Sequence, residues 1–127
     1  MSRKRTIAVQ ALVALSLSAP AMAMDNLASV FAGCTGRISA EMEHAWLMNS
    51  DRADDLEGLR LQFVTLLDAI TPPEQARQVL HFRIEAKLAH AAMLTTATFG
   101  TDPRLVHMAQ NQAALRVRDC RNLLLDS

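Results

Sequence analysis

The sequence predicts an all-α protein, a small up-down-up-down four-helix bundle stapled by one disulfide. Strands are not indicated, because the chain has no sustained alternation of polar and apolar residues and no Asn-Gly or Asp-Gly hairpin turn. Instead, apolar residues recur every three or four positions in four segments rich in Ala, Leu, Met, Glu and Arg. The chain contains 2 cysteines, Cys34 and Cys120, whose spacing suits a long-range bridge.

Residues 1–23 have the pattern of a cleavable export signal. A basic start is followed by an apolar run from Ile7 to Leu17 and by the small-x-small sequence Ala21-Met22-Ala23. Removing the signal from the 127 residues leaves about 104, which is the size of a single domain over 24–127. We therefore expect a mature protein in the bacterial periplasm.

Four helices are predicted over 26–49, 51–70, 72–99 and 103–125. In the first, Gly33 and Gly36 favour a break near Thr35. One face nevertheless carries Leu27, Phe31, Cys34, Ile38, Met42 and Ala45. The second follows Asn49-Ser50-Asp51, with Ser50 or Asp51 as its N-cap, and carries the stripe Leu56, Leu59, Phe63, Leu66, Leu67 and Ile70.

The third helix has a predicted capping box at Thr71-Pro72-Pro73-Glu74 and a predicted left-handed cap at Gly100. It carries two apolar stripes, Val79-Phe82-Ala86-Ala89-Met93 and Leu80-Ile84-Leu88-Ala91, which predict contact with two neighbouring helices. The fourth begins with Asp102 as N-cap before Pro103. Its stripe is Val106, Ala109, Ala113, Val117, Cys120 and Leu124.

Short connections make consecutive helices antiparallel, so the start of the first lies beside the end of the fourth. Cys34 and Cys120 are near these ends, which predicts a structural disulfide worth on the order of 4 kcal/mol in the chain-entropy model. An alternative use of Cys34 is a lipid anchor, because Phe31-Ala32-Gly33-Cys34 resembles the lipobox of bacterial lipoproteins. The sequence departs from that motif at Phe31, where Leu is usual, and in the polar residues that separate it from the apolar run.

Composition and motifs exclude several function classes. The mature chain has more acidic than basic residues, because three of the 13 Lys and Arg residues lie within the signal, which argues against nucleic acid. After signal cleavage no stretch approaches the ~20 apolar residues of a transmembrane helix. The phosphate-binding, hydrolase, zinc-protease and haem-attachment motifs are missing, so we expect a protein that is not an enzyme and has no resident cofactor.

A metal site is the main alternative to a pure protein-binding role. Histidine, methionine and acidic residues are predicted to gather at the end of the bundle opposite the disulfide. His with Met suits copper, and His with carboxylates suits zinc. The candidate ligands are His44, Met48, His90, Met93 and His107. The competing interpretation is that His44 faces solvent, His90 is a hydrogen-bonded packing residue and Met93 fills core volume.

Trp46 and Leu47 lie off the core line of the first helix, so at least one apolar side chain is expected on the surface. Trp46 either covers the bundle edge or anchors a contact with a partner. The sequence therefore predicts an accessory or adaptor protein of the envelope that binds another envelope protein or a second copy of itself. Copper or zinc binding and lipid anchoring remain the alternatives.

Overall fold

The computed structural model describes residues 26–125, and the predicted export signal lies outside them. Four α-helices account for nearly all of this part of the chain: α1 (Asn26–Leu47), α2 (Ala53–Ile70), α3 (Ala76–Phe99) and α4 (Pro103–Leu125). A single 3₁₀ turn, η1 (Pro73–Gln75), precedes α3. The all-α fold class and the order of the helices are therefore confirmed.

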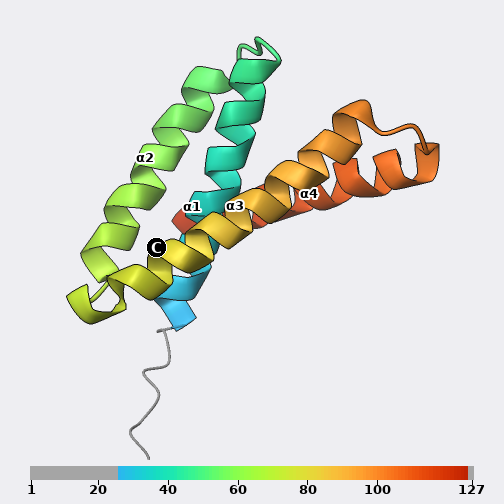
Figure 1. The fold of residues 1–127 in the computed structure, drawn as a ribbon. Coiled ribbons are helices and arrows are strands. Elements are labelled where there is room, and N and C mark those ends of the chain that lie inside the picture. Colours follow the sequence, from blue (N-terminus) through green and yellow to red (C-terminus); the bar gives the residue numbers. More distant parts are fainter. Residues whose placement is uncertain (1–25, 126–127) are drawn as a thin grey trace, which may run out of the picture.

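The four helices form two antiparallel hairpins, α1–α2 and α3–α4, which cross and then diverge (Figure 1). Extensive contacts join α1 to both α2 and α3, and α4 packs mainly on α3. Among the described residues, no Cα of α2 lies within 8 Å of a Cα of α3 or α4. The bundle is therefore built around the α1–α3 pair, with α2 and α4 on its flanks.

Gly36 explains why α1 and α3 pack so closely. A Cβ at this position would collide with the carbonyl oxygen of Arg83 and would stand 2.9 Å from the amide nitrogen of Lys87. The backbones of the two helices thus touch at Gly36, and no side chain fits between them. The expected break near Thr35 is absent because Gly36 serves this contact, and α1 continues through Thr35 with the Thr35 hydroxyl bonded to the Phe31 carbonyl at 2.8 Å.

The main hydrophobic core lies largely where α2 packs on α1, and Val79 of α3 and Val117 and Cys120 of α4 complete it. Phe63 of α2 and Ile38 of α1 are completely buried, and the rings of Phe31 and Phe63 have centroids 5.8 Å apart. Burial of a side chain of this size stabilises the fold by about 1.5–3 kcal/mol. The core residues of α2 are those of its predicted stripe, of which Leu56, Leu59, Phe63 and Leu67 are buried.

The predicted disulfide is present between Cys34 of α1 and Cys120 of α4, with Cα atoms 5.5 Å apart. Both sulfurs lie in the main core cluster, beside Val117. The bridge therefore fastens the last turns of α4 to α1 near the crossing. The sulfur of Cys34 is bonded to that of Cys120, so it cannot also carry a lipid. The structure has the disulfide.

The helix termini confirm one predicted cap and correct three. The N-cap of α2 is Arg52, with no side-chain cap hydrogen bond, rather than Ser50 or Asp51. Asp102 Oδ1 accepts a hydrogen bond from the Arg104 amide at 2.9 Å, as expected of an N-cap. Thr71 does not cap α3, because its hydroxyl donates to the Leu67 carbonyl at 2.6 Å. Pro72 is followed by a second proline, and the residue before a proline is restricted to extended backbone. The helical turn therefore starts at Pro73 and not at Pro72.

Gly100 is likewise not a left-handed cap, since its φ is −63°. Glycine is required there for space: a Cβ would collide with the Thr96 carbonyl oxygen and stand 2.9 Å from Val106 Cγ2. The left-handed residue of the described chain is instead Asn49, with φ 50°, in the turn between α1 and α2.

The two apolar stripes of α3 differ in their burial. Val79, on the first stripe, is buried, whereas Leu80, Ile84 and Leu88 of the second are exposed. The predicted contact of α3 with two neighbouring helices is confirmed, since α3 packs on α1 and α4. The second stripe is nevertheless exposed, because α2 packs on α1 and leaves this side of α3 uncovered. None of the described helices combines the length and the apolarity needed to cross a membrane.

Candidate functional site

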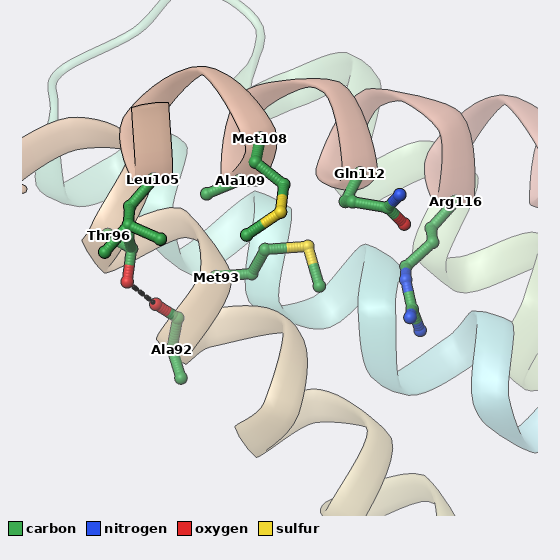
Figure 2. Close-up of a pocket in the computed structure, with 8 residues that line it drawn as sticks. All are labelled: Ala92, Met93, Thr96, Leu105, Met108, Ala109, Gln112 and Arg116. Atoms are coloured by element: carbon green, nitrogen blue, oxygen red, sulfur yellow. Dashed lines mark hydrogen bonds between the residues drawn. The ribbon is translucent and has the colours of Figure 1, made fainter. Parts of the chain in front are cut away.

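An apolar groove runs along the α3–α4 hairpin on the side away from α2. Its volume is about 550 Å³, and its lining comes from three residues of α3 and five of α4: Ala92, Met93, Thr96, Leu105, Met108, Ala109, Gln112 and Arg116. We refer to it as the methionine groove. Figure 2 shows the side chains of Met93 and Met108 lying next to one another between the two helices.

The two methionines differ in how firmly they are held. Met93 is half-buried and packs against the core cluster formed by Ala40, Leu94 and Ala113. Met108 is 56% exposed, and Leu105, one turn earlier on α4, is 49% exposed. Thioether side chains are flexible and polarisable, so such a surface adapts to apolar partners of different shape. The groove therefore has a fixed wall on α3 and an adaptable one on α4.

The positively charged side chain of Arg116 lies at one end of the methionine groove. Arg116 extends from α4 beyond Gln112, on the same side as the methionines (Figure 2). Burial lowers the pKa of the neighbouring Arg37 guanidinium below its usual value, the charge of Arg116 lowers it further, and Asp119 acts in the opposite direction. Arg116 therefore places a positive charge at this end of the groove, which favours the approach of an acidic group.

The groove has a local cause in the sequence. Ala92 and Ala109 are small, and Thr96 turns its hydroxyl back to the Ala92 carbonyl at 3.1 Å, so none of the three fills the space between the helices. Met108 and Leu105 lie off the buried stripe of α4, which Ala109, Ala113, Val117 and Cys120 form. Apolar residues outside that stripe were the one feature of the sequence from which a groove on α4 could have been predicted. Met93, predicted to be a metal ligand or to fill core volume, lines this groove, which the sequence patterns did not predict.

Trp46 and Leu47 are both on the surface, at the end of α1, with exposed fractions of 52% and 72%. Met48 follows them and is also exposed. Leu47 borders a small hollow between α1 and α3 that also includes His44 and Thr95. Trp46 lines none of the cavities described here, so the structure gives it no built site.

His90 and Glu41 form a buried pair at the α1–α3 contact. The imidazole is completely buried, and its Nε2 donates to Glu41 Oε1 at 2.8 Å, because an ionised carboxylate can only accept. Arg52 Nη2 lies 4.0 Å from the other carboxylate oxygen. Among residues 26–125, His90 Nδ1 has no hydrogen-bond partner. His90 is thus a packing residue held by Glu41, as the competing interpretation expected.

The other two candidate histidines are hydrogen-bonded to residues other than His90. His44 Nε2 lies 3.0 Å from the Thr98 hydroxyl, and His107 Nδ1 accepts from Asn111 on its own helix at 3.2 Å. Within residues 26–125, no three His, Cys, Asp or Glu side chains are placed to share a metal ion. The two hairpins diverge beyond their crossing (Figure 1), and the bond between His44 of α1 and Thr98 of α3 is a contact that remains between them.

No family model matches the chain, and no curated protein or solved structure matches it either.

Proposed function

We propose that the protein is exported to the bacterial periplasm and acts there by binding, as an accessory or adaptor protein of the envelope. Its binding surface is the methionine groove, and its occupant is an amphipathic helix of a partner protein. The observation that supports this proposal is the groove itself, an open apolar channel with Met93 and Met108 between its walls and a cation at one end.

The shape and charge of the groove argue for a helix as occupant. From Leu105 to Arg116 it follows α4 for about 16 Å, which matches three turns of a docked helix. An apolar helix face entering a groove lined by methionines is a common mode of peptide recognition. The Arg116 end favours an acidic side chain on that helix, at the end of its apolar face.

Two features support the periplasm as the place of action. The predicted signal at 1–23 directs export. The Cys34–Cys120 disulfide fits an oxidising compartment. Cell fractionation followed by intact-mass measurement tests this part of the proposal. We expect a periplasmic species that begins at Met24 and is two hydrogens lighter than the dithiol, whereas a chain that begins at an acylated Cys34 would overturn it.

Site-specific photo-crosslinking in cells tests the groove. A benzophenone amino acid replaces Met108 in one variant and Leu61 in the control, because Leu61 is 62% exposed but lies on α2. We expect one discrete adduct from position 108 and none of the same mass from position 61. Mass spectrometry of the adduct should locate the crosslink in a partner segment that has an amphipathic helical pattern and an acidic residue.

Charge reversal at the end of the groove provides a second variant. Arg116→Glu, combined with the crosslinker at position 108, should reduce the adduct at least tenfold, whereas Arg77→Glu at the exposed start of α3 should leave it unchanged. An adduct insensitive to Arg116→Glu, an adduct with a second copy of this chain, or the absence of any adduct would overturn the proposal. Equal adducts from positions 61 and 108 would also do so.

A further inference from the structure

A second cavity lies on the opposite side of α4 from the methionine groove. It has a volume of about 380 Å³ and a floor of small apolar residues from α3 and α4: Leu94, Ala97, Ala113, Ala114 and Val117. The remaining lining is polar and consists of Glu41, Arg52, Gln110, Arg118 and Arg121. We call it the arginine cleft. Residues 116 and 118 lie about 200° apart around a helix, so α4 separates the cleft from the groove.

The three arginines of the cleft are engaged to different degrees. Arg121 Nη2 donates to Asp55 Oδ2 of α2 at 2.8 Å. Arg52 stands 4.0 Å from Glu41, at the limit of an ion pair. The side chain of Arg118 forms no ion pair or hydrogen bond with any other residue of the described chain, 26–125. The cleft therefore contains a guanidinium with its donors free.

Glu41 does not cancel this positive charge. Its side chain is only 10% exposed, and its Oε1 already accepts from the fully buried His90. Its second oxygen faces Arg52. Of the three guanidinium groups, Arg52 faces Glu41 and Arg121 is bonded to Asp55, so Arg118 supplies the uncompensated positive charge above the uncharged floor.

We infer that the arginine cleft binds a small amphiphile that carries a carboxylate on an apolar chain. The carboxylate pairs with Arg118, because the planar guanidinium matches the two oxygens of a carboxylate. The chain lies on Ala97, Ala113 and Val117, where it leaves water for an apolar surface. Both parts of the ligand are required. A carboxylate without an apolar chain gains little binding free energy over its hydration in water, and an apolar chain without a carboxylate forms no ion pair with Arg118.

The test uses the purified, disulfide-bonded protein and the probe sodium octanoate, followed by amide chemical shifts in NMR titrations. We expect saturable shifts at Ala97, Ala113 and Arg118. Acetate supplies the charge alone and octanol the chain alone, and each should bind at least tenfold more weakly. A peptide that ends in two leucines and a free carboxylate tests whether the acid comes from a protein terminus. Tighter binding of octanoate than of this peptide supports the small amphiphile, and the reverse overturns it.

Substitution of the free guanidinium completes the experiment. Arg118→Gln should weaken octanoate binding about tenfold and leave octanol binding unchanged, since only the ion pair is removed. Arg104→Gln is the matched control, because Arg104 is an exposed arginine of α4 that lines neither cavity. Octanoate that binds no better than octanol, equal losses in both variants, or shifts confined to Met93 and Met108 would overturn the inference.

Discussion

The close contact at Gly36 predicts a large and specific effect of adding one methyl group. In Gly36→Ala, the new Cβ meets the Arg83 carbonyl oxygen, the Lys87 nitrogen at 2.9 Å and Ala86 Cβ at 3.2 Å. Non-bonded heavy atoms are comfortable near 3.5 Å, so α1 and α3 must separate by at least about 0.6 Å. The obstacle is helix backbone, which cannot rotate away as a side chain does. We therefore expect the overpacking cost of about 1–3 kcal/mol to exceed the ~1 kcal/mol that alanine gains over glycine inside a helix.

Gly58 provides the matched control, because it lies inside α2 and a Cβ there meets nothing within 4 Å. Gly58→Ala should raise the free energy of unfolding by about 1 kcal/mol, which is about 4–8 °C in Tm for a domain of this size. Gly36→Ala should lower it by up to about 2 kcal/mol, the overpacking cost less the gain in helix propensity. Urea unfolding followed by far-UV circular dichroism, with the disulfide intact, measures both. The reasoning is refuted if Gly36→Ala is as stable as Gly58→Ala.

Two further predictions concern the disulfide and the buried pair. Because the Cys34–Cys120 bridge spans a sequence separation of 86 residues, its reduction should lower the free energy of unfolding by on the order of 4 kcal/mol, and an unchanged urea midpoint in the presence of reductant would contradict this. Glu41→Met should cost about 1–3 kcal/mol because the buried His90 Nε2 loses its acceptor. Glu43→Met, which removes only an exposed pair with Lys87, should cost less than about 1 kcal/mol in the same thermal melts, and equal losses would disprove the difference.

Helix positions were predictable because they depend on local chemistry. The apolar stripe of α2, the N-cap at Asp102 and the pairing of Cys34 with Cys120 follow from short-range rules together with antiparallel connections, and all three are confirmed. Thr71 shows the limit of such rules. Its hydroxyl had a competing acceptor in the preceding turn, the Leu67 carbonyl, and took it instead of the amides of the next helix.

The helix that packs on each apolar face was not predictable. An apolar stripe shows which face of a helix is apolar, but it does not show which neighbouring helix covers that face. Leu80, Ile84 and Leu88 formed a stripe as regular as the buried one of α2, yet they are exposed. Gly36 determines which helices pack together. A glycine inside a helix either weakens that helix or allows the backbone of a neighbouring helix to approach closely. A break in α1 was the prediction at Gly36, whereas the structure shows close contact with the backbone of α3.

The same close contact accounts for both candidate binding surfaces. In a square four-helix bundle each helix touches two neighbours, and α1 and α3 lie across a diagonal with side chains between them. Here the diagonal pair is in backbone contact at Gly36, so α2 and α4 are held on the flanks and the hairpins diverge beyond the crossing (Figure 1). Both sides of α4 are then only partly covered, which leaves the methionine groove on one side and the arginine cleft on the other. Arg118 lines the cleft, and its side chain forms no ion pair or hydrogen bond with the described residues, so Arg118→Gln should change binding without changing stability.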